Sequence, residues 1–200
     1  MSFKETSFGM LLVLTVTAVI IGGVLAGAYQ KFYPKIEANR IAEEKRAIFA
    51  VLEGAENYEI IEREIDGKKG KEIVKIFKGL TAAGNLVGYA FIAEGPGFQA
   101  KIKMMVGLNF EFKKLLGMKV LEQLETPGLG NKIVKEKFTD QFQGLAFTPK
   151  IEYLKNKKPE KDNQIQAITG ATISSKAVVN AINKRVKIIM DILSEDLKGE

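Results

Sequence analysis

The pattern of hydrophobic and polar positions separates an apolar N-terminal stretch from a mixed remainder. No residue from Thr6 to Gln30 is charged, and residues 10–28 are nearly all apolar. At about 1.5 Å per helical residue, a stretch of this length can cross a bilayer core. The pattern therefore predicts a transmembrane anchor within residues 1–30.

Features at the end of this stretch support an anchor. Aromatic and basic residues suited to a membrane interface follow it directly: Tyr29, Lys31, Phe32, Tyr33 and Lys35. Gly23 and Gly27 form a GxxxG pattern, which lets another helix approach closely. The alternative is a cleavable signal peptide with Ala26-Gly27-Ala28 as its cleavage site. The apolar run exceeds the roughly 7–15 residues of a signal peptide core, so we favour a retained anchor.

The remainder predicts a helical stalk followed by an α+β domain. Pro34 breaks the apolar pattern, and a helix then extends to Leu52, with Gly54 as its C-cap. Four apolar side chains of this stalk, residues 31–54, share one face: Ile41, Ile48, Val51 and Leu52. Four β-rich runs follow, at residues 72–77, 86–93, 101–110 and 117–124.

Turn signals and a final helix complete the expected domain, residues 55–200. Turns are expected at Asp66-Gly67 and Gly84-Asn85, a kink or loop at residues 94–97, and an exposed lysine-rich loop at residues 155–161. Residues 174–197 have the periodicity of an amphipathic helix. Strands followed by a helix predict a mostly antiparallel sheet packed against helices.

Composition limits the chemistry that the chain can perform. It has no Cys, His or Trp, which argues against iron–sulfur clusters, ordinary zinc sites and His-ligated haem. The net charge of +6 comes from interleaved signs without a basic, aromatic-spaced stripe, so nucleic acid binding is not expected. Any redox chemistry must come from an organic cofactor, and hydroxyl groups are the remaining points of attachment.

One segment combines small residues, hydroxyl groups and a helix start. Residues 165–175, IQAITGATISS, lead directly into the last predicted helix. Free N–H groups and the helix dipole favour an anion there, and Gly170 and Ala171 allow it to approach the backbone. A plain helix start with Ser174 or Ser175 as N-cap explains the same residues. The pattern alone leaves both interpretations open.

Residues 169–175, TGATISS, resemble the flavinylation motif of the FMN-binding domain family. In that family a dedicated flavin transferase joins the FMN phosphate to the second threonine as a phosphoester. The resemblance implies that Thr172 carries covalent FMN, that the FMN site involves Thr169, Gly170 and Ala171, and that Ser174 and Ser175 hold the phosphate. The family usually has Asp six residues before the acceptor, whereas this chain has Gln166. If that carboxylate helps the transferase to recognise its target, we expect either slower modification or a requirement for a tolerant transferase.

A second match lies upstream. Residues 125–130, ETPGLG, resemble a loop of the G subunit of Rnf complexes and the C subunit of the sodium-pumping quinone reductase. Chemistry alone predicts a tight turn here, but the resemblance implies that this loop is one wall of the flavin site. The expected flavin contacts, including two weaker glycine-rich matches, are Glu125, Thr126, Gly128, Leu129, Gly88, Tyr89 and Phe98.

The resemblance implies an electron-relay subunit of a membrane ferredoxin:NAD⁺ oxidoreductase that translocates ions, with the other Rnf subunits and the transferase as partners. It covers nearly the whole chain, and the short length favours the Rnf G subunit over its quinone-reductase relative. No independent catalytic residue and no metal site are expected. A membrane-anchored binding or assembly module without cofactor is the rival from another class.

The orientation of the domain has conflicting signals. The family implies a single-pass protein of the inner membrane with its domain on the outer face. Five basic residues follow the span, whereas only Lys4 precedes it, and this weakly favours the reverse. Glu37, Glu43 and Glu44 intersperse those basic residues, and large domains translocate despite charge. We therefore expect the outer face.

Overall fold

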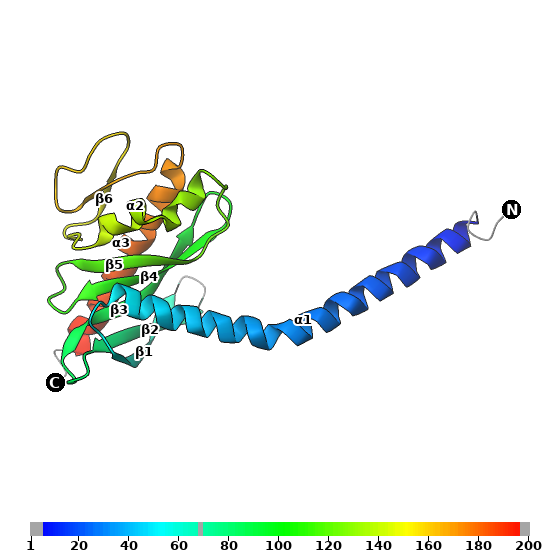
Figure 1. Cartoon of the computed structure of the whole chain (residues 1–200), viewed down its shortest axis with the longest axis horizontal. Helices are drawn as coiled ribbons and strands as arrows, with labels where there is room; N and C mark the ends of the chain where they lie inside the picture. The colour runs from blue at the N-terminus through cyan, green and yellow to red at the C-terminus, as the bar shows by residue number, and fades with distance from the viewer. Residues whose placement is uncertain (1–5, 68–69, 197–200) are drawn as a thin grey trace. The chain divides into compact units, whose positions relative to one another are not determined.

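The computed structural model describes residues 6–67 and 70–196 and divides into two compact units, Met1–Glu43 and Glu44–Glu200 (Figure 1). The position of Lys4, the residues after Gly67 at the first predicted turn, and the predicted helix end at Leu197 lie outside the described residues.

Helix α1, Ser7–Val51, contains both the predicted anchor and the predicted stalk. It continues through Pro34, so the expected break there is wrong. Proline removes one backbone hydrogen bond, which weakens a helix but does not end it when helix-forming turns flank it on both sides. Gly54, with φ +88°, follows the helix as expected for a C-cap.

The first unit contains the long apolar part of α1. Its side chains are largely exposed, including Leu11, Leu14, Val19 and Val24. Among the described residues, α1 is the one helix that is long and apolar enough to cross a membrane. Large apolar side chains exposed in such a row are expected of a helix whose solvent is lipid.

The second unit is built on a five-stranded antiparallel sheet, which confirms the expected fold class. The strands follow chain order: β1 (Asn57–Gly67), β2 (Gly70–Leu80), β3 (Leu86–Pro96), β4 (Lys101–Asn109) and β5 (Leu115–Glu122). Strand β1 was not predicted because charged residues interrupt its apolar alternation. It is an edge strand, and its Glu62 pairs with Lys75 of β2 at 3.0 Å.

Helices cover both faces of the sheet. Helix α3, Thr172–Asp196, packs its Val178, Ile182 and Ile189 into the larger core. The last turns of α1 cover the other face, where Ile48 and Leu52 join Phe77. Ile41, predicted on the same face, is exposed. Each face of the domain sheet therefore has its own hydrophobic cluster.

Short elements connect the sheet to α3. They are η2 (Gly130–Val134), α2 (Glu136–Thr139), η3 (Asp140–Phe142) and a parallel pair, β6 (Glu152–Leu154) and β7 (Gln164–Gln166). None was predicted, because three to five residues are too few to show a period. The lysine-rich loop at residues 155–161 joins β6 to β7 and is exposed, as predicted.

One loop prediction is wrong. Glu94, Gly95 and Pro96 continue β3 to its end, with Gly95 opposite Ile102 and Pro96 opposite Lys101. Pro at the last position of a strand is tolerated because few ladder bonds are lost there. Gly95 also fits because α3 lies over it: a Cβ at Gly95 would stand 3.0 Å from Ala181 Cβ.

Candidate functional site

The site begins at the first residue of α3, which is Thr172. Gly170 precedes it in the left-handed region at φ +82°. Ser175 N donates to Ala171 O at 3.1 Å. The N–H groups of Thr172, Ile173 and Ser174 therefore come before the first backbone bond of the helix, at the positive end of its dipole.

Ser175 holds this turn together and is fully buried. Its Oγ accepts from Ile168 N at 3.0 Å and donates to Ala171 O at 3.1 Å. Because α3 already begins at Thr172, neither Ser174 nor Ser175 is an N-cap. The prediction that Ser174 or Ser175 is the N-cap is therefore wrong, and Ser175 fixes the turn from inside the helix.

Glu125 ties three segments of the site together although only 4% of its surface is exposed. Its Oε1 accepts from Phe98 N at 2.8 Å and from Gln99 N at 3.1 Å, both in the loop after β3. Its Oε2 accepts from Ser174 Oγ at 2.5 Å. A buried carboxylate requires such donors to offset its lost hydration. The β3–β4 loop, the 125–130 loop and the start of α3 are therefore joined through one side chain.

Two glycines leave the space that Glu125 occupies. A Cβ at Gly97 would collide with Glu125 Oε1 and lie 2.6 Å from Ala100 O. A Cβ at Gly130 would lie 2.6 Å from Ser174 Oγ and 2.7 Å from Glu125 Oε2. Both positions exclude any larger residue unless the carboxylate moves. The glycine content of the two loops thus has a steric cause.

These segments enclose a cavity of about 380 Å³ that brings the two sequence motifs together. Its wall combines Phe98, which was predicted from a weaker glycine-rich match, with seven residues predicted from the two motifs: Glu125, Thr126, Leu129, Gly170, Ala171, Thr172 and Ser174. Gly130, Lys155 and Ile173 complete it. Thr126 accepts through Oγ1 from Gln99 Nε2 at 2.9 Å. The structure therefore places the 125–130 loop beside Thr172.

Five predicted residues lie outside this wall. Thr169 donates to Asn156 Oδ1 at 3.5 Å, Gly128 forms a turn at φ +77°, and Ser175 is buried behind the wall. Gly88 and Tyr89 lie in β3, where the Tyr89 ring stacks on Phe112 at 5.6 Å and a Cβ at Gly88 would collide with Leu108 O. Their geometry gives these two residues a packing role in the sheet.

Sequence reasoning missed Lys155 and Ile173 as wall residues. Lys155 belongs to a lysine-rich loop in which nothing distinguishes one lysine from the next. Ile173 stands within the TGATISS motif and is 57% exposed, and an exposed apolar residue at a helix start was a signal available from the pattern.

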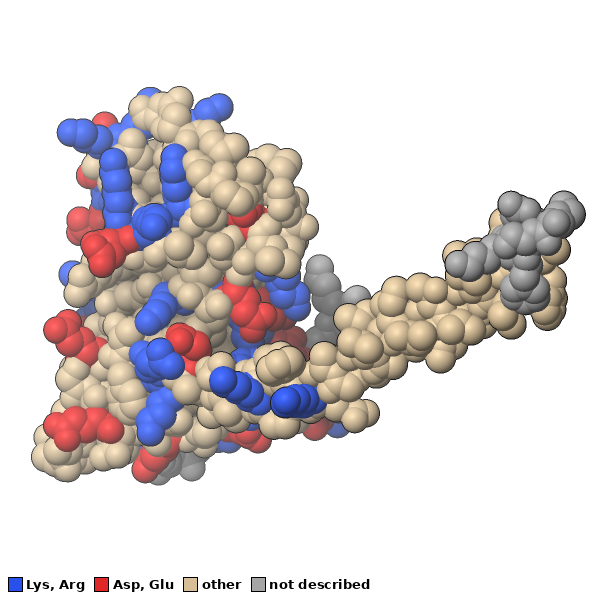
Figure 2. All heavy atoms as spheres, turned by 45° about the vertical axis from the view of Figure 1, so that its right-hand side comes forward, with Lys and Arg blue, Asp and Glu red and all other residues tan. Residues whose placement is uncertain are grey.

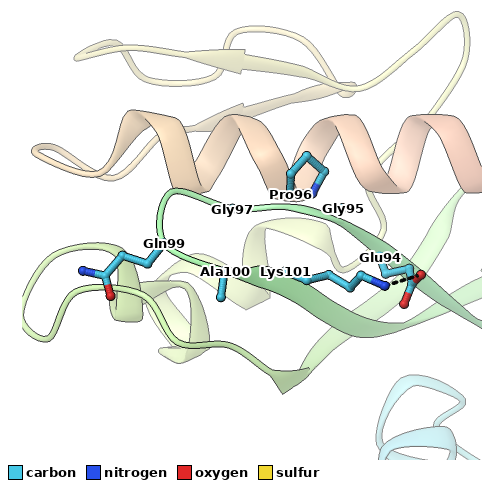
Figure 3. Close-up of a pocket in the computed structure, with 7 residues that line it drawn as sticks. All are labelled: Glu94, Gly95, Pro96, Gly97, Gln99, Ala100 and Lys101. Carbon is cyan, nitrogen blue, oxygen red and sulfur yellow. Dashed lines mark hydrogen bonds and ion pairs between the residues drawn. The ribbon is translucent and has the colours of Figure 1, made fainter.

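A second hollow, of about 450 Å³, follows the β3–β4 hairpin and includes Gly97 and Gln99 (Figure 3). Lys101 Nζ pairs with Glu94 Oε1 at 2.9 Å, and Pro96 points toward α3. Its charged groups satisfy each other across the hairpin, so the hollow presents no unpaired charge to a ligand.

Comparison with known proteins agrees with this geometry. Residues 97–187 match the family model described as FMN-binding domain. The matched residues include the Glu125 loop and Thr172. The chain is 29% identical over 189 residues to the G subunit of the ion-translocating oxidoreductase complex of Methanosarcina acetivorans, covering 94% of this chain and 97% of that protein. It is 32% identical over 189 residues to the G subunit of the same kind of complex in Shewanella piezotolerans, covering 86% and 84%. This chain belongs to that G subunit family.

Two further comparisons extend the likeness. The G subunit of the Na⁺-translocating ferredoxin:NAD⁺ oxidoreductase complex of Acetobacterium woodii is 30% identical over 175 residues, 84% of this chain and 81% of that protein. The crystal structure of Shewanella oneidensis NqrC superimposes with a TM-score of 0.60 at 21% identity, covering 74% of this chain and 73% of NqrC. This G subunit thus shares its fold with NqrC.

Proposed function

We propose that this G subunit relays electrons within a membrane ion-translocating ferredoxin:NAD⁺ oxidoreductase, and that it does so through FMN bonded by a phosphoester to Thr172. The observation that carries the proposal is the cavity formed by the Glu125 loop and the start of α3, inside the matched FMN-binding region. FMN supplies reversible electron uptake and release when bound. The chain's own residues hold it, orient it and limit its contact with water.

The start of α3 suits the phosphate of FMN. The N–H groups of Thr172, Ile173 and Ser174 and the helix dipole favour an anion beside the Thr172 hydroxyl. Lys155 adds a positive charge on the cavity wall. Gly170 leaves room for the phosphate to approach the backbone. A larger residue there would adopt a strained backbone conformation, and its Cβ would lie 3.3 Å from Leu129 Cδ2. Backbone, dipole and ammonium thus act on the same side of the cavity.

The flavin ring also needs a flat apolar surface to pack against, and exposed side chains of the cavity wall provide one. Phe98 is 62% exposed and Leu129 is 45% exposed. Small-molecule sites measure about 300–1,000 Å³ and combine apolar walls with few polar groups, and this cavity falls in that range. Gln99 and Thr126 supply polar groups at its edge.

The serines have a different role in this proposal from the one that the motif alone implied. Ser174 donates its hydroxyl proton to Glu125, and Ser175 donates its own to Ala171 O. They therefore fix the turn that presents Thr172, and the backbone N–H groups hold the phosphate. Glu125 acts as a positioning residue through Ser174.

Attachment would form one bond, from Thr172 Oγ to phosphorus, and break two, the O–H bond of Thr172 and the bond from phosphorus to the leaving group. Thr172 Oγ loses a proton and forms a bond to the phosphorus of FMN, while a flavin transferase provides the activated flavin nucleotide and takes its leaving group away. The protein then gains one FMN less one water. A phosphoester leaves the ring unaltered, so stacking, hydrogen bonds and burial tune it. Tethering prevents loss of flavin where free FMN is scarce.

We further propose that α1 anchors the subunit in the inner membrane, with the domain on the outer face and the other complex subunits as partners. The helix has the length and the exposed apolar surface for a span. The outer-face orientation follows the family resemblance against a weak excess of positive charge after the span. Reaction of a cysteine introduced at exposed Lys158 with an impermeant thiol reagent in intact cells tests the orientation.

Mass and colour test the flavin proposal against a module without cofactor. Full-length protein coexpressed with a flavin transferase should be yellow after denaturation and heavier by one FMN less water. Thr172→Ala should lose both properties, whereas Thr126→Ala, which removes a hydroxyl from the same cavity, should keep them. A bare Thr172 in active complex purified from native membranes would refute the proposal.

A further inference from the structure

Charge is distributed unevenly over the domain. Lysines of the sheet pair with nearby carboxylates: Lys71 with Glu64, Lys75 with Glu62, Lys78 with Glu59, Lys101 with Glu94 and Lys103 with Glu122. Residues 126–176, by contrast, hold nine lysines against five carboxylates, a net charge of +4 out of +6 for the chain. Within residues 6–67 and 70–196, none of those nine lysines has a carboxylate partner within 4.0 Å.

Five of these lysines belong to segments that reach the cavity, and we call them the basic rim: Lys155, Lys157, Lys158, Lys161 and Lys176. Lys155 lines the cavity, and the next residue, Asn156, accepts a hydrogen bond from Thr169 of the TGAT turn. Lys176 lies one turn after Thr172 on α3, so the two share a helix face. Figure 2 shows extended basic side chains at the upper end of the domain, where Figure 1 places the β6 loop.

Apolar side chains line the same cavity wall as Lys155 of this rim. Phe98, Leu129 and Ile173 line the cavity and are 62%, 45% and 57% exposed. They come from three different segments: the β3–β4 loop, the 125–130 loop and α3. A desolvated apolar centre surrounded by charge is the usual anatomy of a protein–protein contact.

We propose that the basic rim, together with Ile173 beside the cavity that Phe98 and Leu129 line for the flavin ring, forms the docking surface for a redox partner with an acidic face. The inference rests on the proposed function, because Lys155 and Ile173 of this surface line the cavity assigned to FMN. Unpaired lysines raise the encounter rate with an oppositely charged protein, and the apolar centre excludes water at contact. A partner bound at this surface brings its redox centre close to the flavin ring. A lipid surface is the competing occupant, and its charge would act on the same lysines.

The first experiment tests whether the lysines of the basic rim create a positive electrostatic potential at the flavin. Full-length flavinylated protein is reduced anaerobically and mixed with an anionic oxidant, ferricyanide, or a cationic one, hexaammineruthenium(III). The triple variant K157Q/K158Q/K161Q, which leaves the cavity-lining Lys155 in place, should react with ferricyanide about three- to tenfold more slowly at low salt, and the difference should vanish at high salt, because screening removes steering. The matched control K71Q/K75Q/K78Q, which removes the same charge from paired sites on β2, should change little.

The second arm uses the assembled complex in liposomes. Ferredoxin-to-NAD⁺ electron transfer should fall in the triple variant and not in the control, equally in zwitterionic and anionic lipid. Equal ferricyanide rates in all three proteins, or a defect confined to anionic lipid, would overturn the partner assignment, the latter in favour of lipid. The mass of each protein is checked first: absent FMN in the wild-type protein contradicts the proposed function, whereas intact FMN in all three proteins with unchanged rates contradicts only the docking surface.

Discussion

Ser174 Oγ and Glu125 Oε2 lie 2.5 Å apart, in a hydrogen bond between residues separated by 49 positions in the sequence. Both side chains are buried, and each is also close to the place that a Cβ of Gly130 would take. Charge-assisted hydrogen bonds of this kind are short and strong. This contact couples the geometry of the 125–130 loop to the first turn of α3, which carries Thr172.

Removing the Glu125 carboxylate should destabilise the domain. Glu125→Ala leaves Phe98 N, Gln99 N and Ser174 Oγ without their acceptor. Ser174 Oγ is buried, and an unsatisfied buried group costs about 1–3 kcal/mol, whereas water can reach the exposed Phe98–Gln99 segment. We expect a clear fall in the Tm of full-length protein measured by far-UV circular dichroism. Glu125→Gln retains one acceptor oxygen and should lose less than half as much. Equal Tm values for wild type and Glu125→Ala would show that the carboxylate has no energetic role.

The clearance at Gly130 should matter in the same way. Gly130→Ala places a methyl group against Ser174 Oγ and Glu125, and overpacking of this kind costs about 1–3 kcal/mol. We expect a lower Tm and a smaller fraction of flavinylated protein by intact mass. Gly117→Ala is the matched control, because a Cβ there meets no atom within 4 Å. Identical behaviour of the two variants would contradict the role of Gly130.

Gln166 should limit the rate of flavin attachment. The family motif places Asp at this position, so Gln166→Asp should raise the initial rate of FMN incorporation by a flavin transferase, followed by mass against time. The change is structurally mild: Gln141 Oε1 accepts from the backbone N of Gln166 at 2.7 Å, and no side-chain atom of Gln166 takes part in that bond. Gln143→Asp, at an exposed glutamine outside the motif, is the control. Unchanged rates would mean that the transferase does not read this side chain.

Gly23 and Gly27 should form a contact with another membrane helix. A Cβ at either position meets no atom of this chain within 4 Å, so bulky residues there leave the chain's own fold intact. Gly23→Leu and Gly27→Leu should reduce copurification with the integral subunits of the complex. Gly22→Leu, on a different side of the helix, is the control. Complex yields that match wild type in all three variants would exclude this contact.

The sequence by itself determined the elements whose signal is local. The apolar stretch predicted a helix that can span a membrane, and four runs of β-formers predicted strands β2 to β5. The last helix was found within two residues of its start because its period extends over many turns. The motifs at residues 125–130 and 169–175 were visible as well, since each is a continuous run of residues that resembles a known family.

Only the tertiary structure decided what these motifs contact. Glu125 was expected beside the flavin, but its acceptor atoms face Phe98, Gln99 and Ser174, which approach it from distant parts of the chain. The tertiary structure also decided that Lys155 lies on the cavity wall and that the last turns of α1 pack on the sheet. The periodicity of a helix or strand shows which of its sides is buried. Which residue that side contacts depends on how segments separated by tens of residues come together in the fold, and no local pattern contains that information.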